Sequence, residues 1–428
     1  MRVLLYGGGG REHAMAWALS RSPLVGEIHC APCNAGIASL AKIHDIDPSD
    51  PEKALDLAEK LSPDLVVIGP ETPLVAGVAD FIRERGIPVF GPGALGARLE
   101  GSKAFAKLFM ARHGIPTADF DICETVEQAD AALCKRTPPY IVKADGLAAG
   151  KGAFVLGTLL EAREICINLL QRKILGESGR KVVIEDFLPG EELTVLAVTD
   201  GSTFRFLPSS QDHKRAFDGD KGPNTGGMGA YSPVAWADDT FLQKVSFQVV
   251  EPTVRGLALD SIPFRGVLYC GLMVDQSGGI RVLEYNVRMG DPETQAVLPA
   301  FGGDFAALAL ASANGSLGKT VAESTSRFAV GVVMASKGYP SYYEKGFPIS
   351  GLERASGKDG VIVFHSGTTI NGAGQTVSSG GRVLTVVGTG DDLPSARARA
   401  YSALDDIRFE GAFYRKDIAL GKGVKHDE

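Results

Sequence analysis

Residues 2–21 read RVLLYGGGGREHAMAWALSR, and this stretch decides how the N-terminal part of the chain folds. The apolar run at residues 2–6 predicts a β-strand, the glycines Gly7–Gly10 predict a tight turn, and the apolar spacing over Glu12–Arg21 predicts a helix. The apolar run is too short for a signal peptide. A strand, a turn and a helix in this order begin a βαβ unit.

The same alternation continues beyond this first unit. Helical patterns cover Pro51–Leu61 and Pro73–Arg85, and buried-type strands cover Asp64–Ile68 and Pro88–Phe90. Strands that are joined by helices predict a parallel sheet with helices on both faces. We therefore expect an α/β domain at the N-terminus.

Residues 94–113 have a helical pattern, and strands dominate residues 203–287 apart from one helix near 238–258. A β-run at Tyr140–Ala144 leads into a glycine-rich loop and a second β-run at Ala153–Leu156. A segment rich in Ser, Thr, Gly and Asn at 314–327 is typical of a linker. Three further β-runs follow it, at 328–335, 360–365 and 382–388. These patterns predict a multidomain fold of α/β and α+β type with a small β-rich C-terminal domain.

The composition is that of a soluble globular protein. Of the 428 residues, 44% are apolar and 22% are charged, which excludes wholesale disorder. The net charge of −7 argues against nucleic acid as a partner, and no apolar run is long enough for a membrane helix. Six cysteines are too few for a disulfide framework, so we expect a cytoplasmic protein.

The first candidate site is the glycine turn itself. Because Gly7–Gly10 follow a strand and open a helix, their N–H groups could face an anion with help from Arg11. Glu12 stands where a dinucleotide fingerprint requires its third glycine. A phosphate cradle and a plain tight turn therefore both fit this segment.

The second candidate is Lys143 and the loop Gly146–Gly152. A lysine inside an apolar β-run is costly unless it meets an anion. The loop that follows it is rich in glycine and alanine, so it could close over phosphates, although it lacks the spacing of a Walker loop. The lysine and the loop together favour a nucleotide-phosphate site over an ordinary hairpin.

The third candidate is a strand that Pro189-Gly190 interrupts, in the run EDFLPGEE at 185–192. The interruption exposes backbone N–H and C=O groups that could pair with the edge of an adenine, and a nearby carboxylate could accept hydrogen bonds from ribose hydroxyls. Taken alone, the segment fits a charged β-turn at least as well.

The fourth candidate is the strand that carries Glu284, Asn286 and Arg288. A period of two places these three side chains on one face. A carboxylate beside an amide oxygen suits Mg²⁺, and an arginine one step further could hold a phosphoryl or carboxylate oxygen. The alternative is the solvated face of an amphipathic strand, but the turn at 290–294 that follows argues for a site.

The fifth candidate is the long polar loop at 209–229. Loops of this length inside a compact domain are usually functional. Lys214 and Arg215 could bind a phosphate, and Asp212 could bind an amine or hydroxyl groups. His213 is a possible base, but we expect it to be an exposed loop histidine.

Taken together, these segments resemble the phosphoribosylamine–glycine ligase family of the ATP-grasp superfamily. The resemblance extends in order over essentially the whole chain. The runs that carry it are GGREHA at 9–14, NAG at 34–36, GPE at 69–71, LEGSKAF at 99–105, IVKADGLAAGKG at 141–152, SQDHKR at 210–215, GPNTGGMGAYSP at 222–233, GDPETQ at 290–295, FHSGT at 364–368, GGRVL at 380–384 and YRKDI at 414–418.

The resemblance implies the reaction of ATP, glycine and 5-phosphoribosylamine to ADP, phosphate and glycinamide ribonucleotide, the glycine-adding step of purine synthesis. The partners are then small molecules, and the cofactor is Mg²⁺ or Mn²⁺ with ATP as co-substrate. We expect a monomer or a weak oligomer that binds neither nucleic acid nor membranes. The implied domains are a pre-ATP-grasp βαβ domain at 1–100, an ATP-grasp domain at 101–313 with a lid subdomain at about 117–190, a linker at 314–327 and a β-rich domain at 328–428.

The resemblance also assigns site residues position by position. The nucleotide would be bound by the phosphate lysines Lys103 and Lys143, the lid residues Gly146, Gly150, Lys151 and Gly152, the adenine hinge residues Glu185, Phe187 and Leu188, and the ribose carboxylate Glu192, with Glu191 as its rival. The metal ligands would be Glu284 and Asn286. The phosphoribosylamine pocket would be lined by Gly10, Glu71, Asp212, Lys214 and Arg288, of which Arg288, Lys214 and Asp212 would be catalytic.

The chain departs from the family pattern at a few positions. Gly8, Cys33, Val287 and Met289 replace residues that are common in the family, and we expect them to change packing rather than chemistry. The segment before the metal strand carries no carboxylate until Asp275, which argues against a second full magnesium site.

Three other functions compete with this interpretation. A nicotinamide-dependent oxidoreductase would need the missing third glycine and a ribose-binding acid after the second strand. A non-catalytic nucleotide sensor would lack the metal face that Glu284, Asn286 and Arg288 provide. The nearest alternative is another ATP-grasp carboxylate–amine ligase of purine synthesis.

Overall fold

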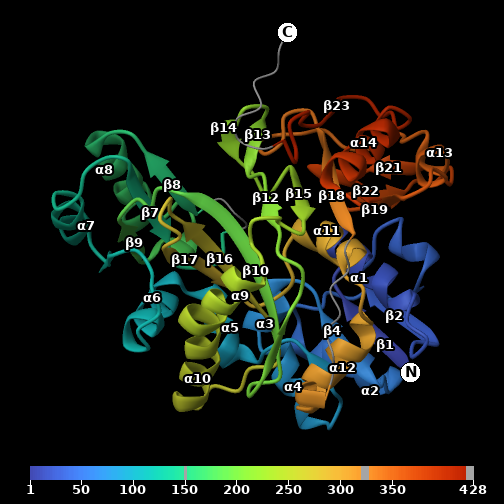
Figure 1. The fold of residues 1–428 in the computed structure, drawn as a ribbon, viewed down its shortest axis with the longest axis horizontal. Helices are drawn as coiled ribbons and strands as arrows, with labels where there is room; N and C mark the ends of the chain where they lie inside the picture. Colours follow the sequence, from blue (N-terminus) through green and yellow to red (C-terminus); the bar gives the residue numbers. More distant parts are fainter. Residues whose placement is uncertain (149–151, 320–326, 421–428) are drawn as a thin grey trace.

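The computed structural model describes residues 1–148, 152–319 and 327–420. It contains an N-terminal parallel sheet, a central part built on two antiparallel sheets, and a C-terminal antiparallel sheet (Figure 1). The fold class predicted from the sequence is thereby confirmed.

The N-terminal sheet has the strand order β3-β2-β1-β4-β5, and every pairing in it is parallel. The last four residues of β1 are fully buried, because a central strand of such a sheet is covered on both faces. The strands are β1 Arg2–Tyr6, β2 Glu27–Ala31, β3 Lys42–Ile43, β4 Leu65–Ile68 and β5 Val89–Phe90. The helices are α1 Gly10–Ser20, α2 Pro51–Leu61, α3 Glu71–Val75 and α4 Val78–Glu84.

One predicted helix of this domain is in fact two. The pattern over Pro73–Arg85 predicted a single helix, but Gly77 separates α3 from α4 with a φ of 82°. A left-handed residue cannot continue a right-handed helix, and glycine adopts this conformation without a steric penalty.

The strand order reverses between β1 and β4. In open parallel sheets, ligands bind outside the carboxyl ends of the strands at such a reversal. Gly7–Gly10 follow β1, and Gly69–Glu71 follow β4. The sheet topology therefore brings these two segments to one crevice.

The central part is built on the sheet β11-β10-β16-β17. The predicted helix over 94–113 is divided at Ser102, whose hydroxyl caps the second helix by accepting from the N–H of Phe105 at 3.1 Å. The strands are β10 Glu191–Thr199, β11 Phe204–Phe206, β16 Gly266–Val274 and β17 Ile280–Asn286. The helices are α5 Ala94–Gly101, α6 Lys103–Arg112, α9 Asp239–Val245, a π-helical turn Ser246–Val250 and α10 Glu251–Leu259.

A smaller antiparallel sheet with the order β6-β9-β7-β8 lies beside the central sheet, with α7 and α8 packed on it (Figure 1). Its strands are β6 Phe120–Cys123, β7 Tyr140–Ala144, β8 Ala153–Leu156 and β9 Val182–Glu185. Its helices are α7 Val126–Leu133 and α8 Leu159–Leu170.

The C-terminal sheet has the order β12-β15-β18-β22-β19, and β23 pairs with β18. Its first two strands come from the long polar loop, so the central part supplies one edge of it. Its strands are β12 Gln211–Asp212, β15 Gly229–Ser232, β18 Phe328–Ser336, β19 Val361–His365, β22 Arg382–Gly390 and β23 Ala412–Phe413. The smaller elements are the ribbons β13 Arg215–Phe217 with β14 Lys221–Asn224 and β20 Thr368–Ile370 with β21 Thr376–Ser378, and the helices α13 Leu352–Ser356 and α14 Leu393–Leu404.

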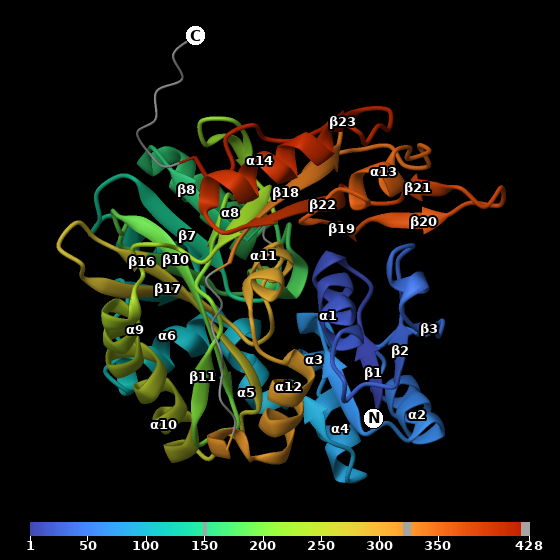
Figure 2. The ribbon, with the colours of Figure 1, turned by 45° about the vertical axis from the view of Figure 1, so that its right-hand side comes forward.

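Two helices connect the three parts. Helix α11 (Glu293–Ala300) is buried along its whole length and contacts α1, β15 and β18, as Figure 2 shows. Helix α12 (Phe305–Asn314) packs against β4 and β5 of the N-terminal sheet. The turn predicted at 290–294 therefore leads into a buried helix at the junction of the three parts.

Candidate active site

The crevice of the N-terminal sheet holds Gly10 and Glu71. A Cβ atom on Gly10 would lie 2.7 Å from Nε2 of Gln295, so a larger residue there would have to displace the end of that side chain. The carboxylate of Glu71 lies 3.5 Å from Nε of Arg288 and 3.9 Å from Nη1 of Arg11. Burial raises the pKa of Glu71, but the two arginines outweigh it and hold the pKa below its usual range.

The glycine turn is held mainly by bonds within the protein. The N–H of Gly9 donates to Oε2 of Glu12 at 2.7 Å, and Nε of Arg11 donates to Oε1 of the same carboxylate at 2.5 Å. Arg11 also donates to the carbonyl of Met289 at 3.2 Å. Of the two interpretations of this segment, these bonds favour the tight turn over a phosphate cradle.

Arg288 lies directly after β17 and is held by two carboxylates. Its Nη2 lies 2.7 Å from Oε1 of Glu100, and its Nε faces Glu71. Glu100, on α5, also accepts from the N–H of Val287 at 2.9 Å. Burial lowers the pKa of Arg288, but Glu100 and Glu71 outweigh it and raise the pKa above its usual range. The sequence interpretation missed Glu100, because nothing local marks a lone glutamate on a helix as a partner of a residue 188 positions later.

Glu284 and Asn286 lie on the same face of β17, as predicted. In the part of the chain that the structure describes, the carboxylate of Glu284 makes no hydrogen bond and no ion pair. Oδ1 of Asn286 accepts one long hydrogen bond, at 3.4 Å, from Arg288. Burial raises the pKa of Glu284, but four surrounding cations outweigh burial and lower the pKa below its usual range. These cations are Lys214, Lys143, Lys103 and Arg288.

A second charged group is formed by Glu192 on β10, Asp212 on β12 and Lys214 just after β12. Nζ of Lys214 lies 2.5 Å from Oε2 of Glu192 and 3.9 Å from Oδ1 of Asp212. Burial raises the pKa of Asp212 to about 7; Lys214 opposes this shift, and Glu293 adds to it. At neutral pH this carboxyl group is therefore able to exchange a proton.

His213, between Asp212 and Lys214, is not the exposed loop histidine that we expected. Its ring centroid lies 6.3 Å from that of Tyr231. Burial is the main cause that lowers the pKa of His213 to about 4, so the imidazole is neutral at physiological pH. A neutral, packed imidazole fits a structural role.

The two predicted phosphate lysines approach from different elements. Lys103 begins α6, and its Nζ donates to the carbonyl of Gly146 at 3.5 Å. Lys143, on β7, donates to Glu185 at 3.0 Å and to the carbonyl of Leu283 at 3.2 Å. The structure thus brings Lys143 and the predicted hinge residue Glu185 into direct contact.

The remaining hinge residues lie after β9. Phe187 is 47% exposed, so its ring is free to contact a ligand. Gly190 has a φ of 152°, and a Cβ atom there would lie 2.8 Å from the carbonyl carbon of Val274. The hinge therefore needs glycine where it crosses the end of β16. Leu188 is half-buried.

The described residues of the predicted lid show how it begins and ends. A Cβ atom on Gly146 would lie 2.7 Å from Oγ of Ser178, and the N–H of Gly146 donates to the carbonyl of Ser178 at 3.2 Å. The carbonyl of Gly152 accepts from Ala144 at 2.7 Å. Gly150 and Lys151 lie outside the described residues, as does 320–326 of the predicted linker.

The strand before the metal strand carries no carboxylate opposite the predicted ligands. Across the ladder, Glu284 faces Gly271 and Asn286 faces Tyr269. Asp275 instead caps the turn between β16 and β17, where its Oδ1 accepts from Ser277 at 2.8 Å. The described residues, 1–148, 152–319 and 327–420, contain no group of three or more His, Cys, Asp or Glu side chains that could hold a metal ion.

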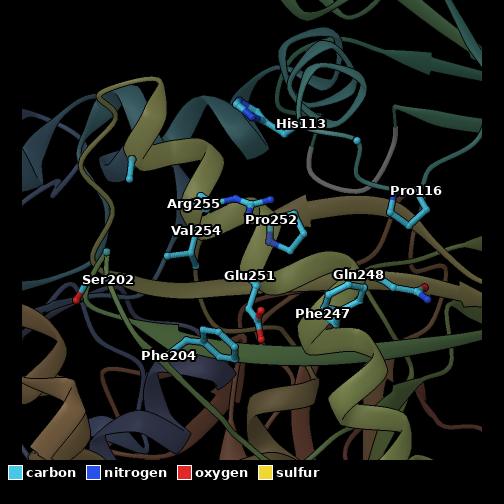
Figure 3. Close-up of a pocket in the computed structure, with 13 residues that line it drawn as sticks. His113, Pro116, Ser202, Phe204, Phe247, Gln248, Glu251, Pro252, Val254 and Arg255 are labelled. Atoms are coloured by element: carbon cyan, nitrogen blue, oxygen red, sulfur yellow. The ribbon is translucent and has the colours of Figure 1, made fainter.

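A separate hollow of about 960 Å³ lies elsewhere in the molecule, as Figure 3 shows. It runs along α10 and the π-helical turn, and its walls include His113, Phe204, Phe247 and Arg255. None of the predicted site residues lines it. The hollow and the charged cluster around Glu284 are therefore separate features of the molecule.

A central antiparallel sheet, a smaller antiparallel sheet beside it and lysines close to Glu284 of the central sheet define an ATP-grasp protein. Models of the three domains of phosphoribosylglycinamide synthetase match the chain in order: the N domain at 1–100, the ATP-grasp (A) domain at 101–294 and the C domain at 329–421. The chain belongs to the phosphoribosylglycinamide synthetase family, and it is an ATP-dependent ligase.

Similar proteins agree over nearly the whole chain. A Streptomyces coelicolor protein named phosphoribosylamine–glycine ligase is 49% identical over 422 residues, which cover 98% of this chain and 99% of that protein. The crystal structure of phosphoribosylamine–glycine ligase from Thermotoga maritima has a TM-score of 0.86 at 38% identity and covers 98% of this chain and 100% of that one. Biotin carboxylase from Campylobacter jejuni has a TM-score of 0.74 at 13% identity, with 96% and 92% covered, and shares the fold alone. None of the helices that the structure describes is long and apolar enough to cross a bilayer.

Proposed function

We propose that this protein ligates glycine to 5-phosphoribosylamine and consumes ATP, which yields glycinamide ribonucleotide, ADP and phosphate in de novo purine biosynthesis. The observation that carries the proposal is the carboxylate of Glu284, which has no hydrogen bond or ion pair among the described residues and is surrounded by Lys103, Lys143, Lys214 and Arg288. Cations from four separate segments of the chain that converge on one such carboxylate suit a phosphoryl group with its counter-ion.

The reaction passes through glycyl phosphate. A free carboxylate is a poor electrophile, because attack on it by an amine would have to expel an oxide. Phosphorylation by ATP turns one carboxylate oxygen into a phosphate leaving group, and the sugar amine then attacks the carbonyl carbon. The catalysis is positioning and charge neutralisation, which the cationic cluster is built to supply.

ATP lies between the central sheet and the smaller sheet. Lys103 and Lys143 bind its phosphates, and the loop Gly146–Gly152, including Gly150 and Lys151, covers them. Glu185, Phe187 and Leu188 hold the adenine, and Glu192 accepts from the ribose. The exposed ring of Phe187 and the glycine-dependent crossing at Gly190 support this placement.

Glu284 and Asn286 hold Mg²⁺ or Mn²⁺. The fit is supported by two oxygen donors on one strand face, of which the carboxylate has no protein partner among the described residues. Mg²⁺ is usually bound by one or two carboxylates together with substrate phosphates and water, so a site with few protein ligands is sufficient. When bound, the ion neutralises phosphate charge.

The phosphoribosylamine pocket is lined by Gly10, Glu71, Asp212, Lys214 and Arg288. Arg288 is oriented by two carboxylates, so its guanidinium group is held in place before the substrate binds. Asp212 takes the proton that the attacking amine releases, a role that its pKa of about 7 permits. Lys214 stabilises the carboxylate form of Asp212 after the amine substrate has bound.

The proposal includes the four-part division of the chain at 100, 313 and 327. It also includes a monomer or weak oligomer in the cytoplasm that binds no nucleic acid, and the net charge of −7 supports the absence of nucleic acid binding.

Phosphate release by the purified protein tests the function. We expect release that requires ATP, glycine and phosphoribosylamine together. Release that accepts another acid in place of glycine would favour the alternative, another carboxylate–amine ligase of purine synthesis.

A further inference from the structure

A buried cluster of charges joins α6, the smaller sheet and β17. Its centre is Glu185, which is 2% exposed and accepts from two lysines. Nζ of Lys143 lies 3.0 Å from this carboxylate, and Nζ of Lys107 lies 2.9 Å from its Oε2 atom. Lys107 is itself 2% exposed, although no local sequence signal distinguishes it from the other basic residues of α6.

Lys107 makes a second bond that reaches the metal strand. Its Nζ donates to Oγ1 of Thr117 at 2.7 Å, and this hydroxyl donates to the carbonyl of Val282 on β17 at 2.6 Å. Lys143 reaches the next carbonyl of the same strand, that of Leu283, at 3.2 Å. The two lysines therefore share one carboxylate, and they reach two consecutive carbonyls just before Glu284, Lys143 directly and Lys107 through the hydroxyl of Thr117.

Two ammonium groups share the carboxylate of Glu185, and the ammonium of Lys143 also interacts electrostatically with the carboxylate of Glu284. Burial lowers the pKa of Lys107 to about 8; Glu185 opposes the shift, and Lys143 adds to it. Because Glu185 is shared, it does not by itself neutralise Lys143, and this ammonium can interact with a second anion.

We propose that Lys107 is a positioning residue of the nucleotide site: it neutralises and orients Glu185, and so leaves the ammonium of Lys143 available to the phosphates of ATP. Without Lys107, Glu185 and Lys143 would form a neutral one-to-one pair, and the ammonium would have to leave that pair to bind phosphate. Lys107 touches neither substrate nor metal; it acts through Glu185 and Thr117. The inference rests on the proposed function only in taking ATP as the ligand of this cluster.

The first test is Lys107→Met, with ATP affinity measured directly by calorimetry in the presence of magnesium. We expect the dissociation constant for ATP to rise about tenfold to a hundredfold, as is usual when an orienting partner is lost. The Michaelis constants for glycine and phosphoribosylamine should stay near those of the parent. Lys135→Met is the matched control, since Lys135 is 66% exposed and pairs with Asp121 on the same subdomain.

A second pair of variants distinguishes a loss of ATP positioning from a general loss of stability. Thr117→Val keeps the side-chain shape but removes the acceptor of Lys107, whereas Thr117→Ser keeps the hydroxyl. We expect weaker ATP binding in the valine variant and parental binding in the serine variant, with similar melting temperatures for both. Equal ATP affinity in the two variants would count against the proposal.

A double-mutant cycle on ATP affinity tests whether Lys107 affects ATP binding through Glu185. If Lys107 acts through Glu185, Lys107→Met should weaken ATP binding far less in a Glu185→Gln background than in the parent. Strictly additive effects would overturn the positioning role. A parent that binds ATP but does not ligate glycine would contradict the proposed function, while these ATP-binding measurements would still decide the role of Lys107.

Discussion

Oδ1 of Asp145 accepts a hydrogen bond from the hydroxyl of Ser102 at 2.8 Å, and a second from the N–H of Ala104 at 2.7 Å. The carbonyl of Asp145 also accepts from the N–H of Lys103 at 3.0 Å. The residue that precedes the glycine loop thus caps the helix that begins with Lys103. A single aspartate therefore sets the position of Lys103, one of the two proposed phosphate lysines, relative to the loop.

We predict that Asp145→Ala lowers stability by about 1 kcal/mol, the usual effect of losing a helix cap, and also raises the Michaelis constant for ATP several-fold. The reason is that Lys103 would no longer be fixed relative to Gly146. Thermal unfolding and ATP titrations measure the two effects. Thr125→Ala, which removes the side-chain cap of α7, is the control and should lower stability alone. If the Michaelis constant for ATP of Asp145→Ala equalled that of the parent, Asp145 would not position Lys103 for ATP binding.

We predict that Glu284→Gln folds normally and loses most magnesium-dependent turnover. Its carboxylate has no hydrogen bond or ion pair to lose among the described residues, but the surrounding cations lower its pKa and so favour the charged form in the folded state; the melting temperature should therefore fall only modestly. The magnesium concentration for half-maximal turnover should rise at least about tenfold. Titration of turnover with magnesium checks this, and a parental curve would remove Glu284 from the metal site.

Asp212 should make both activity and stability depend on pH. Its folded pKa of about 7 lies above the usual value for an aspartate, so the folded state binds the proton more tightly than the unfolded state does. The stability that this proton binding contributes is complete below about pH 4 and is lost as the pH rises to about 7.

Asp212→Asn abolishes this titration. The melting temperature of the variant relative to the parent should therefore increase from pH 4 to 7 and then stay level. Turnover of the parent should rise through pH 7 as Asp212 loses its proton, and the variant should lack this limb. A constant difference in melting temperature across this range would show that Asp212 titrates normally.

Oxygen transfer tests the acyl-phosphate route. With glycine labelled by ¹⁸O in its carboxylate, one labelled oxygen should appear in the released phosphate, because the carboxylate oxygen attacks the γ-phosphorus of ATP. Mass spectrometry of the phosphate measures the label. Unlabelled phosphate from an active, glycine-dependent reaction would exclude glycyl phosphate.

The sequence by itself predicted most of the helices and strands, although two predicted helices proved to be pairs, and it led us to expect a cation ligand. The run 2–21 predicts β1, the glycine turn and α1, because periodicity and turn chemistry act between neighbours in the chain. The spacing of Glu284 and Asn286 likewise places two oxygen donors on one face of β17, since the strand period is two. The ordered motifs carried the family resemblance, which the domain matches confirm.

Only the tertiary structure decided which charges meet. Glu100 holds Arg288 across 188 positions, and Lys107 and Lys143 share Glu185 from two other elements. Burial and neighbouring charges then shift the pKa values of the site. Burial raises the pKa of Asp212 to about 7, whereas the cations around Glu284 outweigh burial and lower the pKa of its carboxyl group. Periodicity along the chain carries no information about such pairs, because packing between sheets brings them together and the local dielectric sets their strength.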